Sequence, residues 1–272
     1  MIEKNYERHG FLMDSLFQDL ARCYYDMYPD TPDLLVEITL TDNLNSTHAQ
    51  LRPDIKQELL ADNPQNDFNG RMVVPISLDD PIHILLNTSK IKEYTDDGSM
   101  TWIGTFAHEY THAVDFFQMA RLEGLTTYGP LERADQYLMF QLWTEYHARK
   151  RGYRFLRQFH SNAGMIPSET DAQISYITET EWPFHNRRFY QEYHADRNGK
   201  NQMYLTMQLL GRYSVWADLF PECFNENSLS LDFYGTDWMV DLFRFLRTHE
   251  SINEIYPAFG KLEEVFRENW PI

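Results

Sequence analysis

The five residues His108-Glu109-Tyr110-Thr111-His112 constrain this chain more than any other segment. Apolar residues at helical spacing surround them and predict a helix over residues 102–123. A spacing of four residues brings the two imidazoles onto one face of this helix, about 6 Å apart. Two neutral ring nitrogens can bind one metal ion there, and zinc is the ion typical of such ligands. Glu109 would lie beside the open position of the metal and act as the general base.

A histidine pair at this spacing also has a plain structural explanation, in which both side chains are hydrogen-bonded and bind no metal. The motif by itself leaves both interpretations open. Its position on an amphipathic helix that follows strand-like segments favours the metal site, because this is the structural context in which the motif binds zinc.

A catalytic zinc ion needs a third protein ligand and leaves its fourth position to water. The motif helix is followed by a turn at residues 124–129 and then by Pro130, a residue favoured at the first position of a helix. A second helix is therefore expected from Leu131 to about Phe159, antiparallel to the first. The candidate ligands are Asp115, Glu132, Glu145, His147, Glu192 and His194.

Position along the second helix separates these candidates. The two histidines lie about 13 residues before the turn, and about 13 residues past Leu131 the chain reaches Glu145, which is the predicted third ligand. Glu132 falls near the turn and is interpreted as a first-turn carboxylate favoured by the helix dipole. His147 points to the opposite side and is assigned to packing or to the surface. Asp115 is either a carboxylate that orients a ligand imidazole or a solvent-facing aspartate.

The His-Glu-x-x-His helix, the turn and a second helix with a glutamate resemble the gluzincin branch of the zincin metallopeptidases. The stretch from His108 to Val114 is similar to the active-site helix of thermolysin-like enzymes, whereas Trp143-Thr144-Glu145-Tyr146 lacks their glutamate-helix pattern. The separation of 33 residues between His112 and Glu145 is closer to that of clostridial neurotoxin light chains. The resemblance implies a zincin-like fold, bound Zn2+ and hydrolysis of peptide bonds in a peptide or protein substrate.

Such an enzyme also needs a donor for the developing oxyanion and an edge strand that holds the substrate backbone. The segment from Trp182 to His194 is dense in histidine, tyrosine and arginine. Arg187 and Tyr190 lie one turn apart and resemble the arginine and tyrosine that assist the neurotoxin light chains, and His194 is a third candidate. An aromatic packing face is the alternative for this segment. For the edge strand we expect Ile82 to Asn87.

A run of basic residues follows Glu145 on the same predicted helix. Cations near the end of a helix usually form a solvated face that the helix dipole favours. A preference for acidic substrates is the alternative interpretation. The run consists of Arg149, Lys150, Arg151, Arg154 and Arg157.

The order of strand-like and helical patterns predicts an α+β fold. Besides the two helices already described, helical patterns cover residues 12–28, 53–61, 184–197, 202–218, 236–249 and 260–268. Strand-like runs cover residues 34–40, 72–76 and 82–86. Loops are expected at residues 160–180 and 221–235.

This layout predicts a zincin-like architecture of two parts with a soft boundary. Residues 1–125 would form a small mixed sheet with helices and carry the motif helix. Residues 126–272 would be mainly helical and carry the glutamate helix. An active-site cleft is expected between the two parts.

Composition limits the partners and the location of the protein. The formal net charge of -17 makes the average surface repel phosphate backbones and anionic lipids, so neither nucleic acid nor a membrane is an expected partner. The first residues lack the basic start and apolar run of a secretory signal, and Cys23 and Cys223 are the only cysteines. A cytoplasmic protein is expected, or one exported without a classical signal peptide.

Two other classes of protein compete with a zinc peptidase. Glu109 and His112 also form a Glu-x-x-His unit of the kind found in di-iron carboxylate helical proteins. That site needs a second such unit, which neither Glu145-Tyr146-His147 nor Glu192-Tyr193-His194 supplies. A catalytically inactive binding protein on a zincin scaffold is the second alternative, although such a protein would not need Glu109.

Overall fold

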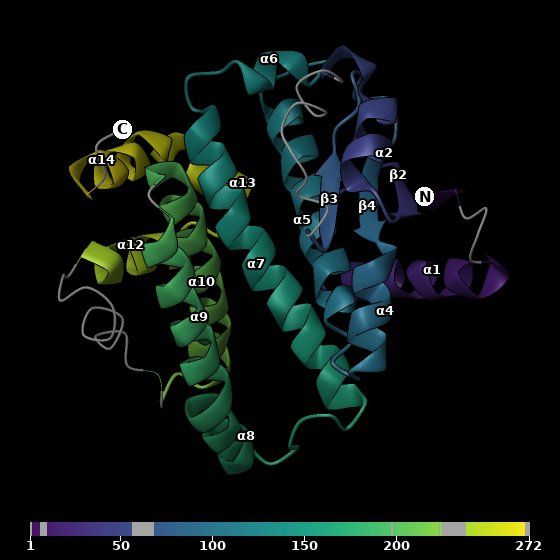
Figure 1. Cartoon of the computed structure of the whole chain (residues 1–272). Coiled ribbons are helices and arrows are strands. Elements are labelled where there is room, and N and C mark those ends of the chain that lie inside the picture. Colours follow the sequence, from purple (N-terminus) through teal and green to yellow (C-terminus); the bar gives the residue numbers. More distant parts are fainter. Residues whose placement is uncertain are drawn as a thin grey trace. The chain divides into compact units, whose positions relative to one another are not determined.

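The computed structural model describes residues 2–5, 10–55, 68–196, 198–222, 224 and 238–269. The chain is mostly helical with one small mixed sheet, which confirms the predicted α+β class (Figure 1). It divides into two compact units, Met1–Ala134 and Asp135–Ile272, here called the N-terminal and the C-terminal unit. The expected boundary at residues 125 and 126 lies just before the observed one. No helix among the described residues is long and apolar enough to span a bilayer.

A four-stranded sheet in the order β1-β2-β4-β3 forms the centre of the N-terminal unit. β1 (Ile2–Asn5), β2 (Val36–Thr41) and β4 (Ile82–Asn87) are parallel to their neighbours, and β3 (Gly70–Val73) pairs antiparallel with β4. The three predicted strand-like runs correspond to β2, β3 and β4, whereas β1 was not predicted.

The predicted edge strand is wrong, because Ile82–Asn87 lies between β2 and β3 and is an interior strand. Its residues are almost all buried, as expected for a strand with neighbours on both sides. β3 forms one edge of the sheet and β1 the other. The prediction chose Ile82–Asn87 for its strongly apolar sequence. Such a sequence is typical of an interior strand, whereas an edge strand need not be apolar.

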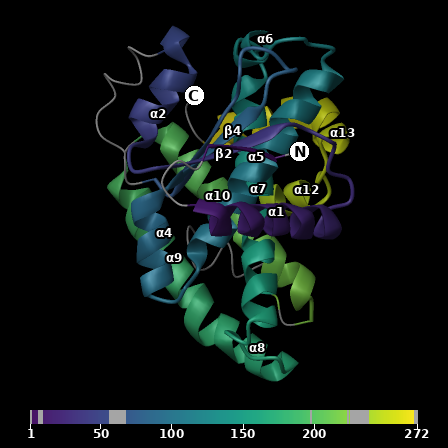
Figure 2. The ribbon, with the colours of Figure 1, turned by 90° about the vertical axis from the view of Figure 1, so that its right-hand side faces the viewer.

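α1 (Gly10–Met27) and α5 (Thr101–Leu122) form the helical core of this unit. α1 runs across the direction of α5 in both views (Figures 1 and 2). Aromatic rings join them, since Phe17 contacts Phe106 at 5.7 Å and Tyr24 contacts Tyr110 at 4.9 Å between ring centroids. α5 also packs against β3 and β4, so that the predicted motif helix lies between α1 and the sheet.

Two helices of the N-terminal unit were not predicted, α2 (Leu44–Leu51) and α4 (Thr88–Asp96). Each is short and begins after an asparagine, Asn43 or Asn87, whose side chain accepts hydrogen bonds from the first turn. Of the helix expected at 53–61, the structure describes a 3-10 turn, η1 (Pro53–Ile55), and the rest lies outside the described residues.

The described part of the C-terminal unit is helical. α10 packs against α7 and α9, and the three helices lie side by side (Figures 1 and 2). The elements are α7 (Tyr137–Asn162), α8 (Thr170–Tyr176), a π-helical turn η2 (Ile177–Glu181), α9 (Trp182–Ala195), α10 (Gly199–Leu219), α12 (Trp238–Arg247), α13 (Ile252–Ile255), the 3-10 turn η3 (Tyr256–Ala258) and α14 (Phe259–Asn269).

Two predicted boundaries near α7 are wrong. Pro130 does begin a helix, but this is the single turn α6 (Gly129–Glu132), and α7 starts only at Tyr137. Residues 132–136 are all exposed, so no apolar face stabilises a helix across them. The loop expected at 160–180 contains α8 and most of η2. The loop expected at 221–235 lies largely outside the described residues.

Candidate metal centre

The two middle residues of the motif attach α5 to α1. The Tyr24 and Thr111 hydroxyls are hydrogen-bonded at 2.7 Å, and Thr111 also donates to the carbonyl of Ala107 at 2.7 Å. The Tyr110 hydroxyl donates to that of Tyr25 at 3.2 Å. These contacts fix the rotation of α5 about its axis, and thereby the directions in which His108, Glu109 and His112 point.

The imidazoles of His108 and His112 converge as their spacing predicted. Their Nε2 atoms lie 3.1 Å apart, and the rings are perpendicular, with an interplanar angle of 89°. Two nitrogen ligands of a tetrahedral zinc ion, each about 2.0–2.1 Å from the metal, are separated by about 3.3 Å. The observed separation fits this donor pair. It also fits a hydrogen bond from one Nε2–H to the other ring, which is the structural alternative.

Glu109 is buried and points to the sheet. Its Oε2 atom accepts a 2.7 Å hydrogen bond from the backbone N–H of Met72 on β3. In an antiparallel ladder, alternate residues direct their backbone groups away from the partner strand. The Met72 N–H is such an outward group, so Glu109 is held at the edge of β3 that β4 does not cover. A charge-assisted bond of this kind fixes the orientation of the carboxylate.

Arg71 is the charged neighbour of this carboxylate. Its guanidinium donates to Asn45 Oδ1 at 3.0 Å and lies 3.3 Å from His48 Nδ1. Burial lowers the pKa of Arg71, and the negative charge of Glu109 partly offsets this effect. Burial, followed by the charge of Arg71, lowers the pKa of His48 to about 4. Sequence reasoning missed both Arg71 and the backbone of Met72, because only strand pairing brings them to the motif.

The candidates for a third ligand have different surroundings. Glu145 is half-buried on α7, with Arg149 3.9 Å away. Glu132 lies 3.7 Å from Arg52, and therefore behaves as the ion-paired carboxylate of a short helix. His147 is buried and stacks on Trp143 at 4.9 Å, which confirms its assignment to packing.

Glu145 was predicted to lie level with the two histidines on a helix that begins at Leu131. Because α7 begins at Tyr137, this reason does not hold, and Glu145 as the third ligand stays a prediction. Asp115 is fully buried on α5, so the solvent-facing alternative for this residue is wrong. A role for Asp115 in orienting a ligand imidazole stays a prediction.

The three candidates for assisting catalysis lie on α9. Arg187, Tyr190 and His194 are exposed, and the rings of Tyr190 and His194 are in contact at 4.3 Å. Phe189 is the buried aromatic residue of this helix and contacts Tyr193. The packing face therefore excludes the three candidates, and their role in catalysis stays a prediction.

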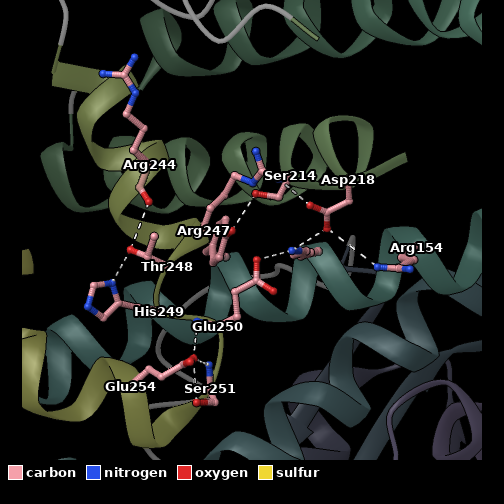
Figure 3. A network of polar contacts seen from close by, with 12 residues as sticks. Arg154, Ser214, Asp218, Arg244, Arg247, Thr248, His249, Glu250, Ser251 and Glu254 are labelled. Carbon is pink, nitrogen blue, oxygen red and sulfur yellow. Dashed lines mark hydrogen bonds and ion pairs between the residues drawn. The ribbon is translucent and has the colours of Figure 1, made fainter. Parts of the chain in front are cut away.

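Most of the basic run on α7 is not a solvated face, although Arg154 is exposed. Lys150, Arg151 and Arg157 are buried. Lys150 pairs with Asp218 at 2.8 Å and with Glu250, within a network that Arg247 joins through Asp218 at 2.9 Å (Figure 3). Arg157 pairs with Glu181, a residue of the π-helical turn. These cations serve the interior of the C-terminal unit.

Comparisons of the chain with protein-family models, with curated proteins and with solved structures found no match.

Proposed function

We propose that this protein is a zinc-dependent metallopeptidase with a zincin-like N-terminal unit. One observation carries the proposal: the Nε2 atoms of His108 and His112 converge at 3.1 Å on a helix whose Glu109 is bonded to the edge strand of the sheet. A histidine pair that serves only to fill the core has no need of a buried carboxylate beside it. A catalytic site requires both.

His108 and His112 would hold the zinc ion together with Glu145. The three side chains offer two imidazole nitrogens and a carboxylate oxygen, a donor set that a metal ion could use. Zinc bound there would polarise the scissile carbonyl and acidify the attacking water. The predicted cleft between the two units belongs to this proposal and stays a prediction.

Glu109 would remove the proton from the attacking water and deliver it to the leaving amine. The Met72 N–H keeps one oxygen of the carboxylate in place during both transfers. The same edge of β3 would bind the substrate backbone as an added strand, through the outward-facing backbone groups of Gly70 and the carbonyl of Met72, since the Met72 N–H is already bonded to Glu109. Arg187, Tyr190 and His194 are the proposed candidates for stabilising the oxyanion.

The sheet argues against the di-iron alternative, since those sites are built inside helical bundles. The buried general base argues against an inactive zincin scaffold. Metal stoichiometry separates these classes, because one zinc per chain supports the peptidase and two irons support the oxidase.

The decisive variant is Glu109→Gln. The glutamine carbonyl can still accept the Met72 N–H, so the fold and zinc content should be retained while the base is lost. Hydrolysis should fall by at least about a hundredfold. Cleavage products would be identified by mass spectrometry after incubation of a proteome-derived peptide library with the wild-type and variant proteins.

Glu93→Gln is the matched control, because Glu93 is a partly exposed carboxylate on α4 paired with Lys90. It should cleave as the wild type does. If Glu109→Gln yields the same products at similar rates as this control, Glu109 is not the base and the mechanism fails.

A further inference from the structure

Arg71 lies in the middle of the edge strand β3. The face of β3 that carries Gly70 and Met72 is turned to α5, because a Cβ atom at Gly70 would lie 2.9 Å from Thr105 Cγ2. Side chains alternate between the two faces of a strand, so Arg71 is on the opposite face. Its guanidinium accordingly donates to Asn45 on α2. The Arg71 side chain therefore lies beside the edge of the sheet that β4 does not cover, on the face that packs against α2.

Three neighbours orient the guanidinium of Arg71 and use only part of it. One nitrogen, Nη1, donates to Asn45 Oδ1 at 3.0 Å and lies 3.3 Å from His48 Nδ1. The exposed ring of Phe68 faces the guanidinium, with 5.7 Å between the Arg71 Cζ atom and the ring centroid. The Nε and Nη2 groups donate to no residue that the structure describes, and the side chain is partly exposed. The Nε–H and Nη2–H donors are therefore available to a ligand.

The charges near Arg71 favour an anionic ligand side chain on this face. Glu109 acts on Arg71 through its charge, but both printed hydrogen-bond partners of the guanidinium are neutral groups on α2. His48 is uncharged at pH 7, because burial and then the charge of Arg71 lower its pKa to about 4. A partly buried guanidinium attracts a carboxylate more strongly than an exposed one, since the effective dielectric constant is lower there.

The register of β3 decides which side chain of an added strand meets Arg71. The Asn87 N–H donates to the Asn69 carbonyl at 3.0 Å, so these two residues form a hydrogen-bonded pair. Arg71, two residues further along β3, belongs to the next such pair, and its backbone groups face β4. A strand added at the free edge bonds to the outward groups of Gly70 and to the carbonyl of Met72. Its residue opposite Arg71 has its side chain on the same face, with about 4.5–5.5 Å between the Cβ atoms.

We propose that Arg71 is a specificity-determining residue, which selects an aspartate or a glutamate at the substrate position opposite it on β3. This inference rests on the proposed function, from which it takes the peptide as the ligand and the edge of β3 as its place. A guanidinium matches a carboxylate in geometry and binds it through paired hydrogen bonds, which the Nε and Nη2 groups supply. The main-chain hydrogen bonds of an added strand give affinity for any sequence, whereas the side chain that meets Arg71 gives selectivity.

The preference is tested on the metal-free full-length protein, so that binding is measured without cleavage. The probes are the peptide acetyl-Thr-Val-Glu-Val-Thr-amide and its counterpart with glutamine in place of glutamate. Calorimetric titration at constant ionic strength gives a dissociation constant for each peptide. The wild type should bind the glutamate peptide about tenfold more tightly, as expected for one charge-assisted pair of hydrogen bonds. Slower hydrogen exchange of the Gly70 amide, whose N–H faces outward, should report binding at this edge.

Arg71→Gln should abolish the preference, because its amide can still donate to Asn45 but carries no charge. Arg71→Lys keeps the charge without the paired geometry, so part of the preference should remain. Arg121→Gln is the matched control, since Arg121 also faces an aromatic ring, that of Phe117 at 5.5 Å, but lies on the last turn of α5. It should keep the full preference. Because the preference is a ratio of two constants of one protein, a general loss of stability does not imitate the expected result.

Three results would overturn the inference. They are the absence of peptide binding, equal binding of the two peptides by the wild type, and a preference that survives in Arg71→Gln. A third peptide, with glutamine and a free C-terminal carboxylate, tests the source of the negative charge. If it binds as tightly as the glutamate peptide, the carboxylate comes from the chain end and the selection of an acidic side chain is wrong.

The metal-free measurement separates this inference from the proposed peptidase. If Glu109→Gln cleaves peptides as its control does, the mechanism fails, while the binding of the glutamate peptide and its dependence on Arg71 should persist. If the preference for glutamate is absent, the role of Arg71 fails, while the result expected for Glu109→Gln is unaffected.

Discussion

Two groups of buried polar side chains, one in each unit, are arranged differently. In the C-terminal unit, the buried cations Lys150 and Arg157 each lie against a carboxylate, and the ion pairs join helices that are distant in sequence. In the N-terminal unit, the imidazoles of His108 and His112 face each other, with their Nε2 atoms 3.1 Å apart. A metal ion bound between the two imidazoles would gain two nitrogen ligands. A further ion pair in the C-terminal unit would add little to the stability of the fold, because its buried cations Lys150 and Arg157 are already paired. The comparison therefore sets ion pairs that connect helices against a histidine pair that is proposed to bind a metal ion.

The largest effect that tests this comparison is the loss of zinc from His112→Ala. The wild type should bind about one zinc per chain, and the variant should bind it more than about a hundredfold less tightly, because a ligand contributes more than the groups that orient it. Metal content would be measured by mass spectrometry after dialysis against a zinc buffer. Full retention of zinc would place the histidine pair among the groups that only maintain the fold.

The third ligand is tested by a pair of glutamate variants on neighbouring helices. Glu145→Ala should weaken zinc binding strongly, whereas Glu132→Ala should bind zinc as the wild type does, because Glu132 is paired with Arg52. The same zinc titration decides between them. The reverse order would exclude Glu145 as the ligand and assign that role to Glu132.

Breaking a buried ion pair should instead lower the stability of the fold. Glu181 accepts hydrogen bonds from Tyr153 at 2.7 Å and from Arg157, whose side chain is 4% exposed. Glu181→Gln leaves the arginine charge buried without a counter-ion, and should lower the free energy of unfolding by about 3 kcal/mol. Urea unfolding followed by tryptophan fluorescence would report this locally, since the Trp216 indole also donates toward Glu181 at 3.3 Å.

The matched control for this pair lies on the surface. Asp19→Asn breaks the exposed pair with Arg22 and should change the free energy of unfolding by less than about 1 kcal/mol. Similar losses for both variants would mean that burial does not distinguish the two ion pairs.

A smaller effect is expected where β3 approaches α5. A Cβ atom at Gly70 would lie 2.9 Å from Thr105 Cγ2 and 3.1 Å from the Leu85 carbonyl oxygen. Gly70→Ala should therefore displace β3 and lower the free energy of unfolding by about 1–3 kcal/mol. It should also speed the hydrogen exchange of the Met72 amide, which donates its hydrogen bond to Glu109. Gly260→Ala is the control, since no atom of the described residues beyond its chain neighbours and its own helix backbone lies within 4 Å of its Cβ position, and it should be neutral or slightly stabilising. Unchanged exchange at Met72 in Gly70→Ala would show that this contact does not hold Glu109.

The smallest effect concerns pH. The pKa of His48 is about 4 in the folded protein and 6.5 ordinarily, so between these values the unfolded chain binds a proton that the folded chain does not. His48 therefore contributes stability above pH 6.5, and this contribution is lost as the pH falls from 6.5 to 4. His48→Gln should flatten the dependence of stability on pH over this window in urea titrations. An unchanged slope would mean that His48 is solvated.

Local patterns in the sequence were sufficient for the α+β class, for α1 and α5, and for three of the four strands of the sheet. The convergence of His108 and His112 was also predictable, because the geometry of one helix places residues four apart on one face. The short helices α2 and α4 were missed because each is defined mainly by a capping asparagine. The start of α7 was misplaced because Pro130 marks a helix start but not how far the helix continues.

The sequence by itself thus determined which side chains of α5 can share a metal ion. Only the tertiary structure decided that β3 rather than β4 lies at an edge of the sheet, that the Met72 N–H holds Glu109, and that Lys150 is neutralised by distant carboxylates. The physical reason is the range of the interactions. Helical spacing depends on residues within one turn, whereas strand order and the pairing of buried charges depend on segments that only folding brings together.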